Sequence, residues 1–179
     1  TEVFWEGHVR AFRFFNGVPC RISYDNESVM VAKVLQSHER KLTEGFLQLQ
    51  SHYLFGEHFC NVRRGNEKGV VESMVRYTRS NFMVPIPQIR NLEELNRILE
   101  ERCRDELKRT LRGKSQTKGE LLEEERSHLH SLPGEPFEAC RKASTTANSL
   151  SLVRFDRNDY SVPVRFAHCP VVIKGYIDR

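Results

Sequence analysis

A short strand pattern that ends in an aspartate, followed by a helical pattern that carries a glutamate, constrains this sequence more than any other feature. Apolar and polar residues alternate from Val18 to Tyr24, which predicts a β-strand, and Asp25 follows directly. Glu72 lies 47 residues further on, in a segment with helical spacing. Two such carboxylates can share a divalent cation, and paired cations commonly promote attack on phosphodiester bonds.

Each carboxylate also has an ordinary structural explanation. Asp25-Asn26 is a pair typical of turns, because short polar side chains bond to the nearby backbone. Glu72 is spaced to form an i,i+4 ion pair with Arg76, which is worth only about 0.2–0.5 kcal/mol. From the residues alone, both explanations stay open beside metal binding.

The hydrophobic periodicity predicts an α/β chain followed by a small all-β module. A strand is also expected within residues 52–60, and an extended segment at 83–87, where two prolines restrict the residues before them. On the helix that carries Glu72, the pattern predicts a buried side formed by Val71, Met74, Val75 and Thr78. Helices are predicted at residues 2–15, 66–82, 92–111 and 120–132. Two further helical pieces are predicted within residues 27–50, on either side of a polar break at 36–41. A flexible basic linker is expected at 113–119, and strands at 150–155, 160–166 and 171–177 predict a barrel-like module.

The composition is that of a folded, mildly basic chain. Of its 179 residues, 39% are hydrophobic and 29% charged, and the net charge of +4 is compatible with nucleic-acid binding. The five cysteines contain no Cys-x-x-Cys pair, which argues against a zinc ribbon or a disulfide framework. His52, His58 and Cys60 lack a fourth zinc ligand at a suitable spacing. Because the sequence begins at Thr1 and stops inside a strand-like run, we expect it to be a piece of a longer protein.

Several motifs together point to a known family. The order helix, strand ending in Asp25, helix, aromatic strand and helix carrying Glu72 matches the second half of a ribonuclease H-like fold. The chain resembles the IstA-type transposases of bacterial insertion sequences, DDE recombinases related in architecture to retroviral integrases and phage Mu transposase. The resemblance covers nearly the whole chain, and its motifs lie at residues 6–19, 24–26, 52–55, 66–72 and 160–163.

The resemblance implies a division of the chain and a role for each carboxylate. Residues 1–88 would be the C-terminal part of an integrase catalytic core of ribonuclease H-like fold, 89–135 a helical connector and 136–179 a truncated β module. Asp25 would be the second acidic residue of the DDE triad and Glu72 the third. The first would lie upstream of Thr1, so this piece alone is expected to be inactive. Oxygen ligands suit Mg²⁺ or Mn²⁺.

DNA is the partner that this assignment implies. Basic side chains beside Glu72 and along the connector are candidates for phosphate contacts. A solvated helix face explains those beside Glu72 nearly as well, and a solvated helix end explains those of the connector equally well. These candidates are Lys68, Arg76, Arg79, Lys108, Arg109 and Arg112. The resemblance further implies a homo-multimer on transposon ends and target DNA, an AAA+ ATPase helper and a place in the bacterial cytoplasm at the nucleoid. Two other functions stay open: a non-catalytic DNA-binding or assembly remnant, and a ribonuclease H-like nuclease.

Overall fold

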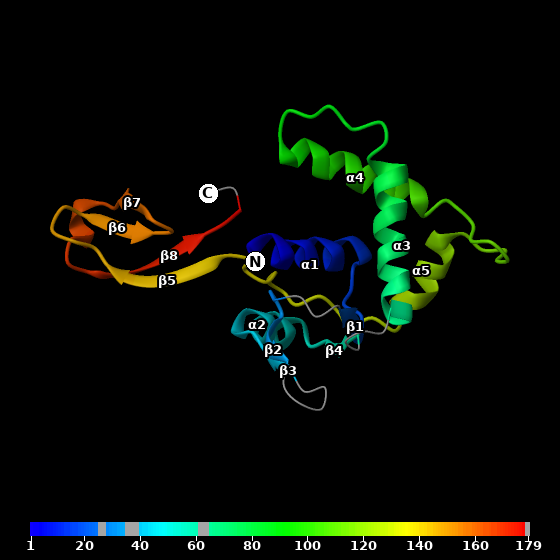
Figure 1. Cartoon of the computed structure of the whole chain (residues 1–179), viewed down its shortest axis with the longest axis horizontal. Helices are drawn as coiled ribbons and strands as arrows, with labels where there is room; N and C mark the ends of the chain where they lie inside the picture. Colours follow the sequence, from blue (N-terminus) through cyan, green and yellow to red (C-terminus); the bar gives the residue numbers. More distant parts are fainter. Residues whose placement is uncertain (25–27, 35–39, 61–64, 178–179) are drawn as a thin grey trace. The chain divides into compact units, whose positions relative to one another are not determined.

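The computed structural model describes most of the chain as helices and short strands (Figure 1). The described residues are 1–24, 28–34, 40–60 and 65–177. They divide into two compact units, one of Phe12–Pro133 and one of Thr1–Ala11 with Gly134–Arg179. No helix in these ranges is both long and apolar enough to cross a membrane.

The chain begins with the helix expected at residues 2–15. α1 spans Glu2–Phe15, and Trp5, Val9 and Phe12 are its buried residues, at i, i+4 and i+7. The helix ends because Asn16 takes a left-handed conformation with φ 55°, and the Gly17 amide donates to the Phe12 carbonyl at 3.1 Å. The predicted stop at Asn16-Gly17 is confirmed.

A parallel pair of strands forms the centre of the Phe12–Pro133 unit. β1 (Arg21–Tyr24) pairs with β4 (Gly56–Phe59), and α2 (Glu44–Tyr53) lies in the connection between them. Parallel strands need such a crossover, because a tight turn cannot bring their starts to the same edge. The α/β class, α2 and the β4 strand were all predicted, and the structure confirms them.

The first half of residues 27–50 is not helical as the spacing predicted. β2 (Val31–Val34) and β3 (Arg40–Leu42) pair as antiparallel strands, with a register shift between Val31 and Lys33. Thr43 holds the end of this pair, since its amide donates to Met30 and its hydroxyl to Val29. The valines of β2 favour extended backbone through their β-branching, which the helical interpretation underweighted.

Three helices complete this unit. α3 spans Gly65–Phe82, α4 Leu92–Glu106 and α5 Lys118–Arg126. α4 and α5 end five and six residues before the predicted ends. The predicted buried side of α3 is also wrong for Met74 and Val75, which are 56% and 46% exposed. Val71 of that set lies outside the side chains that the structure describes.

The C-terminal segment consists of two antiparallel strand pairs. β5 (Arg141–Thr146) pairs with β8 (Pro170–Gly175), and β6 (Leu152–Phe155) pairs with β7 (Asn158–Ser161). The 3-10 turn η2 (Val164–Phe166) stands between β7 and β8. The predicted strand module is confirmed, but its described strands do not close into a barrel. Closure would need hydrogen bonds between the two pairs, and the described strands of each pair bond only to each other.

Sequence reasoning missed β5 and placed the strand expected at 160–166 too late, because β7 ends at Ser161 and η2 follows, whereas β6 and β8 lie largely where strands were expected. The polar run Arg141-Lys-Ala-Ser-Thr-Thr146 has too few apolar residues to stand out, yet it pairs along its whole length with β8. Across the described chain no sheet has more than two strands, so a ribonuclease H-like core stays a prediction.

A close contact at Gly17 provides a test of this packing. A Cβ at this buried position would lie 2.7 Å from Leu129 Cβ, beside the bridge between Val18 and His130. We expect Gly17→Ala to lower the free energy of unfolding by about 1–3 kcal/mol, as overpacking does. Urea unfolding followed by circular dichroism measures the change.

The matched control is Gly7→Ala in α1, where an added Cβ meets no atom within 4 Å. Alanine is the better helix former, so this variant is expected to gain about 0.5–1 kcal/mol. A Gly17→Ala protein as stable as the unaltered chain would contradict the packing described here.

Candidate functional site

The carboxyl ends of β1 and β4 lie side by side and define the candidate site. Tyr24 pairs with Phe59 in the strand register, and the Cys60 amide donates to the Tyr24 carbonyl at 2.9 Å. Arg40 reinforces this edge by donating to the Cys60 carbonyl at 3.0 Å, with its guanidinium 5.2 Å from the Phe59 ring centre. The carboxyl edge of parallel strands is where such sheets usually place their functional groups.

An aromatic cluster of residues from β1, α2 and β4 packs at this edge. The Tyr24 ring lies 5.3 Å from Phe46 of α2 and 6.0 Å from Phe59, and all three residues are buried. Burial, and secondarily the Glu57 carboxylate, raises the pKa of Tyr24 well above its ordinary value. The tyrosine is therefore neutral and contributes packing to the strand end.

The structure describes one of the two predicted carboxylates and not the other. Asp25 follows Tyr24 in the sequence but lies outside the described residues. Glu72 lies in α3, six residues after Asn66, with an exposed side chain that forms no hydrogen bond or ion pair with the described part of the chain. The alternative i,i+4 pair between Glu72 and Arg76 is thus not formed.

Within the described ranges, no three His, Cys, Asp or Glu side chains gather to hold a metal ion. Glu72 brings a carboxylate that no described residue engages, the type of oxygen ligand that Mg²⁺ and Mn²⁺ accept. Its donor chemistry fits such an ion, and Asp25 would bring the same kind of oxygen.

Basic residues predicted to meet DNA fall into two groups. On α3, Arg76 and Arg79 are exposed and have no acidic partner among the described residues, and the side chain of Lys68 lies outside them. On the connector, Lys108 donates to Asp105 at 2.7 Å, and Arg109 is engaged in a larger cluster. Arg112 is exposed and unpaired in the part that the structure describes.

That cluster joins α3 to the segment between α4 and α5, and we call it the Glu106 clamp. It consists of Tyr77, Glu106, Arg109 and Lys118. The Glu106 carboxylate accepts from Tyr77 at 2.8 Å, from Arg109 at 2.7 Å and from Lys118 at 2.6 Å. Arg109 also donates to the Tyr77 hydroxyl at 2.6 Å, and the Lys118 ammonium lies 5.7 Å from the Tyr77 ring centre.

The clamp is electrostatically strong because its central carboxylate is shielded from water. The Glu106 side chain is only 16% exposed. The hydrogen bond from Lys118, with those from Arg109 and Tyr77, lowers the pKa of Glu106 to about 2, against the opposing effect of burial. Sequence reasoning missed the clamp because Tyr77 and Lys118 are distant from Glu106 along the chain.

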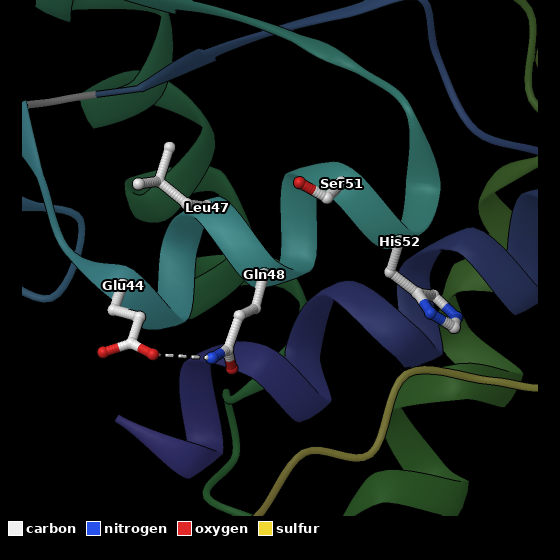
Figure 2. A pocket seen from close by; sticks show the side chains of 5 residues that line it. All are labelled: Glu44, Leu47, Gln48, Ser51 and His52. Carbon is white, nitrogen blue, oxygen red and sulfur yellow. Dashed lines mark hydrogen bonds between the residues drawn. The ribbon is translucent and has the colours of Figure 1, made fainter.

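A hollow on α2 offers no comparable chemistry. It is lined by Glu44, Leu47, Gln48, Ser51 and His52, which all come from one helix (Figure 2). The Gln48 amide donates to Glu44 at 3.1 Å, so the acidic group is already bonded within the helix. The carboxyl edge of β1 and β4, with α3 after it, is the better candidate.

The known proteins to which this chain is similar are transposases. The family described as "Mu transposase, C-terminal domain" matches residues 132–179. A transposase of Aminobacter aminovorans is 37% identical over 99% of this chain. Two proteins of Pseudomonas aeruginosa, the transposases for insertion sequences IS1326/IS1353 and for IS21, are 34% and 33% identical over 99% of it. The chain spans 35%, 35% and 46% of the length of these three relatives.

Acid unfolding tests the Glu106 clamp. A carboxylate whose pKa is lowered on folding stabilises the fold above its unfolded value, near 4.5, and that stabilisation is lost as the pH falls toward about 2. We expect Glu106→Gln to be less stable than the unaltered chain at pH 7, and the difference to shrink between pH 4.5 and pH 2. Urea unfolding at several pH values measures it.

Glu100→Gln is the matched control, because Glu100 pairs with Arg104 in an exposed i,i+4 arrangement on α4. Exposed pairs of this kind contribute only about 0.3–0.5 kcal/mol. A stability difference for Glu106→Gln that stays constant down to pH 2 would show that the clamp does not hold the carboxylate ionised.

Proposed function

Because this chain is a homologue of insertion-sequence transposases over nearly its whole length, we propose that it forms part of a transposase that cleaves DNA and transfers its strands. The observation that carries the proposal is the alignment of 99% of the chain with such proteins at 33–37% identity. Water would attack first, and a DNA 3′-hydroxyl would attack during strand transfer.

The parallel pair β1–β4 supports a catalytic role for this region. Asp25 follows the end of β1 in sequence, and α3 with Glu72 follows β4, so both carboxylates come after the same edge of the sheet. We assign both to the metal site of a ribonuclease H-like DDE core. Bound Mg²⁺ or Mn²⁺ would activate the attacking oxygen and stabilise the leaving oxygen.

Basic residues on α3 suit the DNA substrate, and of these Arg76 and Arg79 are exposed. Arg76 and Arg79 lie one and two turns beyond Glu72 on the same helix, and Lys68 lies one turn before it. Unpaired guanidinium groups bind phosphate oxygens well, since their fork of donors matches that geometry. These three residues would hold the DNA backbone beside Glu72.

A complete active site would need more than this chain. The family pattern requires a third carboxylate, which is expected upstream of Thr1. A multimer on DNA ends and an AAA+ ATPase helper are likewise proposed from the resemblance alone. With two of three carboxylates, a piece of this extent would bind DNA or assist assembly without cleaving it, which is the second candidate function.

Cleavage assays on the transposase polypeptide that contains this chain test the assignment. With Mg²⁺ and a duplex bearing the insertion-sequence end, we expect Asp25→Asn and Glu72→Gln each to reduce strand cleavage by at least about 10³-fold, while circular dichroism is unchanged. Glu93→Gln, on the exposed first turn of α4, is the matched control and should cleave normally.

A second experiment distinguishes metal binding by Asp25 from other roles of this residue. A cysteine at position 25 supplies a softer ligand, so Asp25→Cys is expected to regain cleavage in Mn²⁺ but not in Mg²⁺. Full cleavage by either amide variant would remove the proposal. Nicking without strand transfer by the unaltered protein would favour a nuclease instead.

A further inference from the structure

The turn between α4 and α5 is closed by backbone hydrogen bonds. Its base is closed by a bridge between Thr110 and Thr117 and by the Lys118 amide, which donates to the Arg109 carbonyl at 2.8 Å. The Gly119 amide adds a bond of 2.8 Å to Leu107. Residues 113–119, expected as a flexible linker, thus contain the bridge residue Thr117, which closes the turn, and the first residues of α5.

Charge is distributed unevenly along this turn. Residues 107–119 contain five basic side chains and no acidic one. Three of the five are engaged: Lys108 with Asp105, and Arg109 and Lys118 with Glu106. Arg112 and Lys114 remain exposed, and neither has an acidic partner in the described part of the chain. We call these two residues the basic tip.

The backbone presents the basic tip away from the helices. Gly113, between the two cations, has a φ of +79°, a left-handed conformation that glycine adopts freely. The Lys114 amide donates to Leu111 at 3.0 Å, which tightens the bend. Figure 1 shows the yellow-green segment between α4 and α5 extending beyond the ends of both helices.

The start of α5 does not offer a competing anion site. Thr117 and Glu120 form a capping box, in which the Glu120 amide bonds to the Thr117 hydroxyl and the Glu120 carboxylate accepts from the Thr117 amide. The carboxylate also places negative charge at this helix end. An incoming phosphate would therefore be bound by the side chains of Arg112 and Lys114.

We infer that the basic tip is a preformed contact for the phosphate backbone of duplex DNA, held in place by the Glu106 clamp. The inference rests on the proposed function for the identity of the polyanion. It reassigns the cations of the connector: Arg112 and Lys114 bind DNA, whereas Arg109 and Lys118 position the turn that carries them. Lys108 stays with Asp105.

Salt dependence of DNA binding tests the inference without any cleavage step. Dissociation constants of this chain for a random-sequence duplex are measured in EDTA over a series of salt concentrations. Each phosphate contact adds about 0.9 to the slope of the logarithm of the dissociation constant against the logarithm of the salt concentration. We expect the double variant Arg112→Ala/Lys114→Ala to reduce this slope by about 1.8, with unchanged circular dichroism.

Arg97→Ala/Lys108→Ala is the matched control, because it removes two positive charges whose partners are Glu101 and Asp105. Its slope is expected to equal that of the unaltered chain. Equal loss of slope in both double variants would show that only net charge matters, and would overturn the inference.

Glu106→Gln tests the positioning role of the clamp. Both tip cations remain, and Arg109 and Lys118 lose their carboxylate partner, so the slope should not fall. A less ordered turn should nevertheless weaken binding at the high-salt end of the series, where the added charge is screened. Unchanged binding there would remove the clamp from the inference.

The outcomes also separate the inference from the proposed function. A normal slope in the tip variant overturns the tip and leaves the carboxylate assignment untouched. Absence of metal-dependent cleavage overturns the assignment, whereas the slopes measured in EDTA still report on the tip.

Discussion

The parallel pairing of β1 with β4 is the interaction on which the functional interpretation depends. It aligns the carboxyl ends of two strands that are separated by a hairpin and by α2. The two strands cannot hold this register by hydrogen bonds alone, since an isolated pair of strands is marginal in water. Phe46 of α2 packs against Tyr24 and Phe59, so the crossover helix itself covers the pair at the edge from which the chain proceeds to Asp25 and to α3.

The Glu106 clamp plays a corresponding part for the helices. α4 has no fully buried residue, so little apolar packing holds it in place. A shielded carboxylate with three donors supplies a directional contact instead, and the Arg102 guanidinium adds a bond to the Phe82 carbonyl at the end of α3. The connection between α3 and α4 is therefore mainly polar and sensitive to single substitutions.

Local signals in the sequence were sufficient for elements whose apolar spacing and terminating residues indicate the same boundary. α1 was predicted to the residue because its apolar spacing is followed by Asn16-Gly17. The strand expected from Val18 to Tyr24 was predicted at the right place by its regular alternation, but β1 begins only at Arg21. The capping box of Thr117 and Glu120 is also visible in the sequence, and it would have placed the start of α5 correctly. That signal was overlooked because the basic residues around Gly113 suggested a linker.

Other features depend on contacts that no local window contains. Val31 and Val34 fit a helix or a strand equally well until Thr43 bonds to the backbone at Val29 and Met30. β5 is too polar to be recognised except through its pairing with β8. The same holds for the charges, because Arg109 and Arg112 look equivalent in the sequence. The structure shows that Arg109 bonds to Tyr77 in the clamp, whereas Arg112 has no acidic partner among the described residues.

α3 is the element that the two proposed roles share. Glu72 and Tyr77 lie five residues apart on it, which corresponds to about 7.5 Å along the helix axis. The Tyr77 hydroxyl bonds to Glu106 and Arg109 at the base of the turn that carries the basic tip. The same helix therefore carries the proposed metal ligand and the aromatic residue of the clamp, so a substitution that displaces α3 would affect both.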